Sequence, residues 1–214
     1  MPDYVPGSTG AREDLCRYLA ACYYEPCTDF SEERLFDSML SAASAIDPEL
    51  AESARRLGAA FVAQDMQTLL VDYTRLFIGP SQPVAMPYAS FWLTDDMSMR
   101  HEATQAVLDF YEQGGFDISD DFRELPDHVA AELEFLYQLI FSRNQAQLGG
   151  NADELAAAAA LRSRFVAEHL GAWIGAFAAA VKSGAETAFY RELAEFTERF
   201  VRLEADLARG NCHP

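Results

Sequence analysis

Apolar residues recur at helical spacing along nearly every segment of the chain. The clearest case is a C-terminal seam with alternating steps of four and three residues: Phe189, Leu193, Phe196, Phe200, Leu203 and Leu207. Such steps place side chains on one face of an α-helix. β-Strands would instead need apolar residues at every second position. The pattern therefore predicts an all-α fold, a single-domain helical bundle over residues 1–214.

Short polar residues mark where several of these helices are predicted to begin. Their side chains accept hydrogen bonds from the free N–H groups of a first helical turn. The predicted N-caps are Ser31, Asp47, Asp65 and Asn151. Pro48 supports the second start, because proline suits the first helical position. With further helices over 12–24, 97–113 and 170–181, the chain is predicted to hold about eight.

Four prolines shape the middle of the chain. Prolines 80, 83 and 87 deny the backbone helical hydrogen bonds, so 79–92 is predicted to be a proline-rich loop with a functional surface. The best-defined helix is predicted to begin at Pro126, because the residue before a proline avoids helical geometry.

The helix after Pro126 has two distinct faces. One face is predicted to be buried: Val129, Leu133, Leu136, Tyr137, Ile140 and Phe141. The neighbouring face carries His128, Glu132 and Phe135 and is predicted to be available for a partner.

Charge narrows the range of partners. Sixteen Lys and Arg residues against thirty-four Asp and Glu residues give a formal net charge of -18. This charge repels nucleic-acid phosphates and anionic membrane surfaces, so cationic or neutral partners are expected and nucleic acid is not. Acidic residues are especially dense over 112–134, where Arg123 is the single basic residue.

Location and cysteine usage point to the cytoplasm. Residues 1–11 have neither a basic start nor an apolar stretch, which argues against a signal peptide. The apolar run 170–181 is too short to cross a bilayer, so no membrane insertion is expected. The four cysteines (16, 22, 27 and 212) form no C-x-x-C pair and are predicted to be free thiols.

The chain lacks the usual signatures of catalysis. It has no phosphate-binding glycine loop, no G-x-S-x-G and no H-E-x-x-H, so neither an enzyme nor a bound cofactor or metal is expected. An alternative is a cofactor-binding helical protein or enzyme, with Asp127 and His128 as a proton-transfer pair or His169 as an axial haem ligand. For His169, a core histidine with a satisfied hydrogen bond is the simpler interpretation.

Two segments resemble the TorD/DmsD family of redox-enzyme maturation chaperones. The first is YTRLFIGP at 73–80, followed by PYASFW at 87–92. The second is PDHVAAELEFL at 126–136, close to the family's pattern of Pro-Asp-His and then Glu-Leu-Glu-Phe. Their order and spacing agree with the family. The chain departs from many relatives at Ala89, where an acidic residue is common.

The resemblance implies a helical bundle, either a monomer or a domain-swapped dimer, that binds the twin-arginine leader of an exported redox enzyme. Clients in the family are chiefly molybdenum-cofactor oxidoreductases, and holding the leader delays export until the cofactor is inserted. The nitrate-reductase assembly branch, which acts on a non-exported subunit, is an alternative. Nucleotide binding, associated with some members, has no phosphate loop to support it here.

The candidate leader-binding residues combine charge with an apolar surface. Asp127 and Glu132 are the candidates for arginine contacts, and His128 could fix Glu132 or donate to a leader carbonyl. Acidic residues at a helix start are also favoured by the helix dipole alone. The candidates for the apolar groove are Leu76, Phe77, Pro87, Tyr88 and Trp92, with Pro126 shaping the backbone. Leu76 and Phe77 could equally be core residues.

Overall fold

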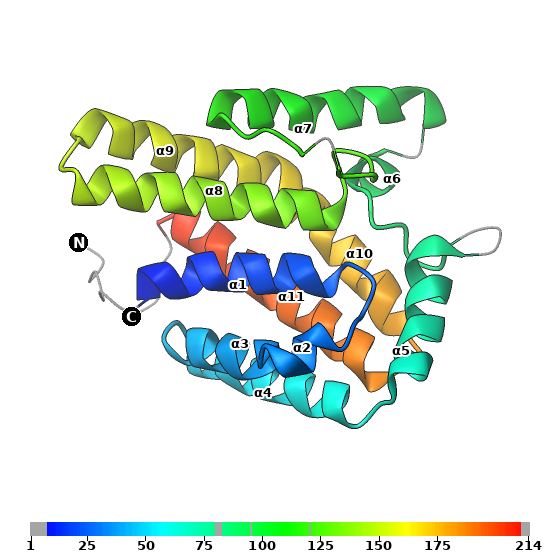
Figure 1. Cartoon of the computed structure of the whole chain (residues 1–214). Coiled ribbons are helices and arrows are strands. Elements are labelled where there is room, and N and C mark those ends of the chain that lie inside the picture. The colour runs from blue at the N-terminus through cyan, green and yellow to red at the C-terminus, as the bar shows by residue number, and fades with distance from the viewer. Residues whose placement is uncertain (1–7, 80–82, 95, 120, 211–214) are drawn as a thin grey trace.

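The computed structural model describes residues 8–79, 83–94, 96–119 and 121–210, and this part of the chain is helical apart from its connections (Figure 1). The prediction of an all-α fold is confirmed. In chain order the elements are α1 (Ser8–Cys22), α2 (Asp29–Glu32), α3 (Leu35–Ser44), α4 (Pro48–Val62), α5 (Met66–Tyr73), the π-helix η1 (Thr74–Ile78), α6 (Ala89–Leu93), the 3-10 helix η2 (Met97–Met99), α7 (Arg100–Gly114), α8 (Val129–Leu148), α9 (Ala152–Phe165), the π-helix η3 (Val166–Leu170), α10 (Gly171–Gly184) and α11 (Ala188–Ala208).

The helices are stacked in pairs around α1 and α11. Helix α1 packs against α8 on one side and α3 on the other, while α11 packs against α4 and α10 (Figure 1). Helices α8 and α9 form a neighbouring pair, and α7 lies across their outer side and against α6. The arrangement brings the end of α1 close to the start of α8, where the candidate site lies.

Three of the four predicted N-caps are confirmed. Asp47, Asp65 and Asn151 each accept the backbone N–H three residues on, at 2.8, 2.9 and 3.2 Å. The Ser31 prediction is wrong, because Ser31 lies inside the short helix α2 and Thr28 holds the N-cap position. The next helix, α3, begins only at Leu35, after Arg34 adopts a left-handed conformation with φ of 54°.

The predicted start of a helix at Pro126 is also wrong, since α8 begins at Val129 with His128 as its N-cap. Backbone pairing with the 87–89 segment explains the delay. The Val129 N–H donates to the Pro87 carbonyl at 2.8 Å, and the Ala89 N–H donates to the Asp127 carbonyl at 2.9 Å. These bonds hold 127–128 outside helical geometry as an isolated antiparallel bridge.

The predicted loop over 79–92 is partly helical. Residues 83–88 are non-helical, as the prolines require, but α6 begins at Ala89. Pro80 lies outside the described residues. Asp127 supplies the reason for the extra helix, because its side chain accepts the Ser90 N–H at 2.8 Å and satisfies a free donor of the first turn.

The predicted seam of α11 faces the core along most of its length. Phe189, Leu193, Phe196 and Phe200 are fully buried, whereas Leu203 is only partly buried. The apolar run over 170–181 is also a core helix, with Trp173 and Phe177 among its largest buried side chains. Burial of this kind is the dominant favourable contribution to folding.

The fold contains two π-helical turns, η1 and η3, and η3 lies next to Glu132 of α8. In η3, the widened turn brings the Val166 carbonyl oxygen to within 2.3 Å of where a Cβ on Gly171 would lie, so this position needs glycine. Single π-helical turns inside α-helices are frequent at functional sites. The η3 turn carries His169, which it directs at Glu132 on α8.

Candidate functional site

Asp127 lies inside the protein rather than on its surface. Its side chain is fully buried, and Oδ2 accepts the Ser90 N–H while Oδ1 has no hydrogen-bond partner in the described part of the chain. Asp127 and His128 share no hydrogen bond, because the His128 Nδ1 accepts the Ala130 N–H at 3.2 Å. The arrangement gives Asp127 a direct role in fixing the start of α6.

Glu132 is buried as well, as are His128 and Phe135, so the prediction that this face is available for a partner is wrong. One carboxylate oxygen lies 2.9 Å from the His169 Nε2, and the other accepts the Trp173 Nε1–H at 3.0 Å. His169, and not His128, therefore fixes Glu132. With its Nε2 committed to Glu132 in the core, His169 offers no free axial position to a haem.

Burial and their mutual contact shift the pKa values of both Glu132 and His169. Burial raises the pKa of Glu132, outweighing the hydrogen bonds from His169 and Trp173. Burial acts to lower the pKa of His169, but the Glu132 carboxylate outweighs it and raises that pKa. Both directions follow from removing a carboxylate and an imidazole from water together.

His128 is surrounded by aromatic rings. The Tyr24 ring stacks on the imidazole with centroids 6.3 Å apart, and Tyr88 meets it edge-on at 5.4 Å. Phe122 approaches from the acidic segment at 6.2 Å. Burial lowers the pKa of His128 to about 4, so the ring is neutral at pH 7.

Two tyrosine hydroxyls hold two carboxylates on either side of this neutral ring. Tyr24 donates to the Glu134 Oε1 at 3.1 Å, and Tyr88 donates to the Glu124 Oε2 at 2.5 Å. We refer to Tyr24, Tyr88, Glu124 and Glu134, with His128 between the tyrosines, as the tyrosine–carboxylate cluster. Burial, and then the neighbouring carboxylates, raise the pKa of both tyrosines, which therefore remain donors.

The cluster presents negative charge at the surface. Glu124 is exposed and Glu134 half-buried, and each carboxylate uses only part of its acceptor capacity on a tyrosine. Glu124 and Glu134 belong to the acidic segment noted in the sequence, but Tyr24 was not predicted. Tyr24 lies two residues after the end of α1, and nothing in the local sequence indicates its contact with α8.

The apolar candidates divide between core and surface. Leu76 and Phe77 are core residues, and Pro87 is buried. Tyr88 and Trp92 are half-buried; the Trp92 Nε1–H donates to the Met86 carbonyl at 2.8 Å, and its ring packs against Phe177.

Pro126 lies next to the cluster and is partly exposed, and its carbonyl accepts the Tyr111 hydroxyl at 2.8 Å. The neighbouring Leu125 is 53% exposed, which gives the cluster an apolar border that Leu76 and Phe77 cannot supply from the core.

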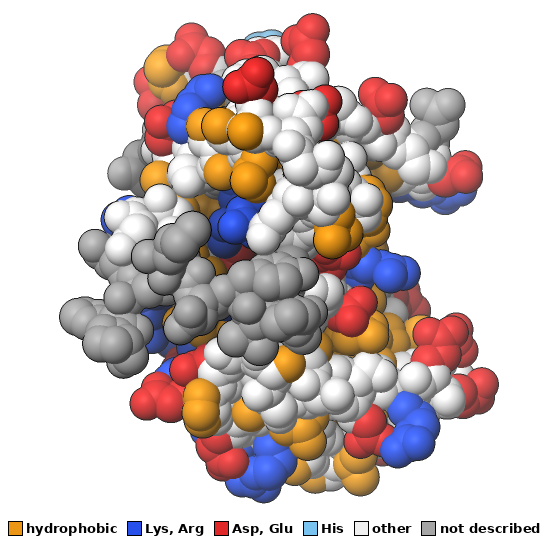
Figure 2. Space-filling view, turned by 90° about the vertical axis from the view of Figure 1, so that its left-hand side faces the viewer, with side chains coloured by type: hydrophobic (Ala, Val, Ile, Leu, Met, Phe, Trp, Pro, Cys, Tyr) orange, Lys and Arg blue, Asp and Glu red, His pale blue; other side chains and the backbone are white. Residues whose placement is uncertain are grey.

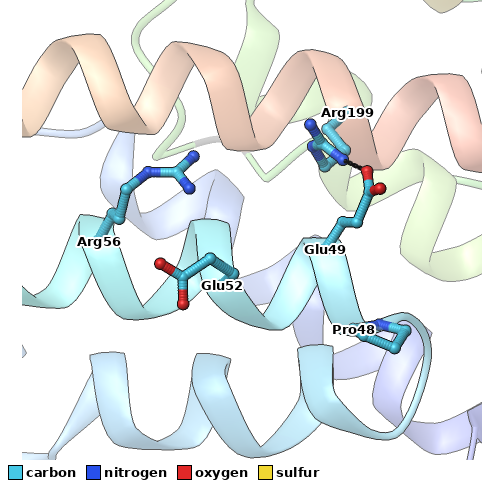
Figure 3. Close-up of a pocket in the computed structure, with 5 residues that line it drawn as sticks. All are labelled: Pro48, Glu49, Glu52, Arg56 and Arg199. Atoms are coloured by element: carbon cyan, nitrogen blue, oxygen red, sulfur yellow. Dashed lines mark hydrogen bonds and ion pairs between the residues drawn. The ribbon is translucent and has the colours of Figure 1, made fainter.

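A hollow lies between α4 and α11, lined by Pro48, Glu49, Glu52, Arg56 and Arg199 (Figure 3). Arg199 pairs with Glu49 across the hollow, as the dashed line in Figure 3 marks. Arg56 pairs with Glu192 at 2.9 Å, and Glu52 with Arg55 at 2.6 Å. The charged side chains that line this hollow are therefore paired, although the Arg199 Nε–H has no acceptor in the described part of the chain.

Acidic side chains are spread over the face shown in Figure 2, with basic side chains between them. Over the described ranges, no three His, Cys, Asp or Glu side chains gather as metal ligands. Cys16, Cys22 and Cys27 are free thiols, while Cys212 lies outside the described residues. None of the described helices is both long and apolar enough to span a membrane.

Comparison with known proteins identifies the family. The family model described as "Nitrate reductase delta subunit" matches residues 43–179. The chain belongs to this family. The match covers the proline-rich segment, the Tyr88–His128 bridge and the Glu132–His169 pair, and it confirms the resemblance to the TorD/DmsD chaperones.

Curated relatives of the chain are named as chaperones. The chain is 27% identical to the chaperone protein TorD of Vibrio vulnificus over 180 residues, covering 84% of this chain and 82% of the relative. It is 28% identical to the chaperone protein TorD of Vibrio cholerae over 169 residues, covering 78% and 70%. These relatives agree with the prediction that this family member is a chaperone rather than an enzyme.

A solved structure supports the same fold. The crystal structure of a putative redox enzyme maturation protein from Archaeoglobus fulgidus superposes with a TM-score of 0.53 at 22% sequence identity. The alignment covers 89% of this chain and 93% of that chain. The all-helical architecture is therefore shared along nearly the whole length of both proteins.

Proposed function

We propose that this protein is a cytoplasmic chaperone that binds the twin-arginine leader of a molybdenum-cofactor oxidoreductase subunit and holds it until the cofactor is inserted. The observation that carries the proposal is the tyrosine–carboxylate cluster, in which Glu124 and Glu134 are each oriented by a tyrosine beside a neutral His128. Membership of the maturation-chaperone family supports a redox-enzyme client.

The cluster matches the chemistry of paired arginines. A guanidinium donates in a planar fork that suits a carboxylate, and it also stacks on aromatic faces. Glu124 and Glu134 supply the carboxylates, while Tyr24 and Tyr88 supply rings and fix the carboxylate orientation. The neutral imidazole of His128 adds no positive charge to repel the arginines.

The apolar part of a leader also finds a matching surface. Leu125 is exposed beside Glu124, and Tyr88 and Trp92 are half-buried on the neighbouring segment. Aromatic side chains with a polar tip suit such partly wet contacts. We propose that the arginines bind at the two carboxylates and the following apolar stretch lies over these side chains.

Calorimetric titration with a twin-arginine leader peptide tests the proposal. The same peptide with both arginines changed to lysine should bind more weakly, because an ammonium cannot reproduce the planar fork. Glu124→Gln and Glu134→Gln should each weaken binding roughly tenfold, the value of a charge-assisted hydrogen bond. Glu112→Gln is the matched control, since Glu112 is exposed and lies in the same acidic segment.

Two outcomes would contradict the proposal. Equal affinity for the arginine and lysine peptides would exclude arginine-specific recognition, and equal losses in all three variants would reduce the effect to overall charge. A salt titration adds a check, since the binding of exposed charges weakens as ionic strength rises.

The family description favours one second candidate. A "nitrate reductase delta subunit" match is consistent with a client that is assembled without export. Such a client would present a segment without paired arginines, and binding to it should survive Glu124→Gln with Glu134→Gln. Pull-down of the client subunit with and without its leader distinguishes the two candidate functions, because only the first requires the leader.

A further inference from the structure

Asp72, in the last turn of α5, is a buried carboxylate that contacts the turn between α10 and α11. Its Oδ2 accepts the Thr187 N–H at 2.7 Å, the Thr187 hydroxyl at 2.8 Å and the Glu186 N–H at 3.1 Å. Its Oδ1 accepts a guanidinium N–H of Arg75 at 2.7 Å. Burial acts to raise the pKa of Asp72, but the hydrogen bonds from Thr187 and Arg75 outweigh it and lower that pKa. An ionised Asp72 therefore fixes the end of α5 to the start of α11.

Arg75 extends this contact to the end of α10. Its guanidinium also donates to the carbonyl of Gly184, the last residue of that helix. Gly184 lies against Val84, because a Cβ added to this glycine would come within 2.3 Å of the Val84 Cγ1. Packed side chains do not approach one another so closely, so only glycine leaves room for Val84 here.

Residues 83–88, which we call the strap, run from this contact to the start of α8. The Val84 N–H donates to the Arg75 carbonyl at 3.3 Å. The next N–H along the strap, of Ala85, donates to the Leu76 carbonyl at 2.8 Å. Both acceptors belong to η1, so the position of η1 determines where the strap begins.

The second half of the strap orients two groups of the proposed leader site. The Met86 carbonyl accepts the Trp92 Nε1–H at 2.8 Å. Tyr88 donates to Glu124 at 2.5 Å, and the Pro87 carbonyl is hydrogen-bonded to the start of α8. A continuous series of hydrogen bonds therefore joins the α10–α11 turn, through η1 and the strap, to the tyrosine–carboxylate cluster.

We propose that Asp72, Arg75 and Gly184 are positioning residues for leader recognition, which act through the strap and do not touch the leader themselves. The inference rests on the proposed function, because Tyr88 and its partner Glu124 are the groups that the strap places. A shift of Tyr88 misaligns the Glu124 carboxylate for the planar fork of an arginine. Recognition groups need such a supporting layer of packing and hydrogen bonds to hold a productive geometry.

Hydrogen exchange of the indole N–H groups tests the strap without any ligand. Trp92 donates to the strap, whereas Trp173 donates to Glu132 in the core. In Asp72→Ala, exchange followed by NMR should become about tenfold faster at Trp92, because its hydrogen bond opens locally. Exchange at Trp173 should change less, since it reports on opening of the core.

Calorimetric leader binding is the second measurement. Asp72→Ala should weaken binding of the arginine leader about tenfold and reduce its advantage over the lysine peptide. Gly184→Ala should do the same by displacing Val84, without changing a charge or an acceptor. Gly175→Ala on the same helix is the matched control and should bind like the wild type. Apart from its own helix backbone, a Cβ on Gly175 meets nothing within 4 Å in the described part of the chain.

A buried charge group elsewhere in the fold controls for loss of stability alone. Glu204 on α11 is fully buried and forms ion pairs with Arg12 on α1 and Arg162 on α9. Glu204→Gln should lower stability, because it leaves buried arginines unpaired. It should leave leader affinity and the preference for arginine unchanged, because this group has no bond to the strap among the described residues.

Affinity and selectivity at the wild-type level in both Asp72→Ala and Gly184→Ala would overturn this inference and leave the proposed function standing. Losses no larger than that of Glu204→Gln would also overturn it, because instability alone would then explain them. A wild-type protein that binds no leader overturns the proposed function as well, so the two failures are distinguished. If Asp72→Ala does not fold, Gly184→Ala and Gly175→Ala decide the question.

Discussion

The Asp127 carboxylate accepts the backbone N–H of Ser90 at 2.8 Å, across 37 positions of the chain. Together with the Tyr88–His128 bridge, this bond joins the segment before α6 to the start of α8. Tyr88 is the N-cap residue of α6 and also the partner of Glu124. Asp127 is therefore placed to position the tyrosine–carboxylate cluster without reaching the surface itself.

Two substitutions of Asp127 distinguish a role in positioning α6 from a direct contact with a leader arginine. Asp127→Asn retains an oxygen acceptor for Ser90 but removes the charge, and it should retain most of the leader affinity. Asp127→Ala removes the acceptor and should weaken leader binding, because the start of α6 loses its tether. Calorimetry on both variants checks this, and a direct arginine contact predicts instead that both lose affinity equally.

Substitutions of Glu132 and of Glu134 should affect different quantities, the first stability and the second leader affinity, although the two residues are only two positions apart. Glu132→Gln leaves one oxygen for two donors, His169 and Trp173, and should cost about 1–3 kcal/mol of stability with the leader affinity preserved. Glu134→Gln should leave stability nearly unchanged but weaken leader binding. Denaturant unfolding and calorimetry on the same preparations measure both quantities, and a common phenotype would contradict the division.

His128 should make the protein sensitive to acid. Its pKa in the folded state is about 4, below the unfolded value of about 6.5, so the unfolded state takes up the proton first. Stability should therefore fall as pH drops from about 6.5 to 4, with His128 contributing up to about 3 kcal/mol. In His128→Asn, which keeps an acceptor at the N-cap, unfolding curves across this range should show a smaller loss.

Breaking the buried charge group should be strongly destabilising. Glu204→Gln leaves Arg12 and Arg162 without their carboxylate, and loss of one partner from a buried ion pair costs about 3–5 kcal/mol. Glu49→Gln is the comparison, because Glu49 pairs with Arg199 but is exposed, and such pairs contribute about 1 kcal/mol or less. Equal destabilisation in the two variants would contradict the assigned role of burial.

The sequence by itself determined those features that depend on neighbouring positions along the chain. Asp47, Asp65 and Asn151 cap the helices that follow because a short side chain reaches a backbone N–H only three residues away. The apolar seam of α11 is encoded by the same local periodicity. The family motifs likewise located the region of the site, although not the orientation of its side chains.

Only the tertiary structure decided which acidic side chains reach solvent. Asp127 and Glu132 read as surface groups because carboxylates are rarely buried unless they are paired, and their partners Ser90, His169 and Trp173 lie 37 to 41 positions away. Tyr24, which follows the end of α1, completes the cluster because α1 packs against α8. Hydrogen bonding between distant segments fixes burial, and no local spacing in the chain encodes such contacts.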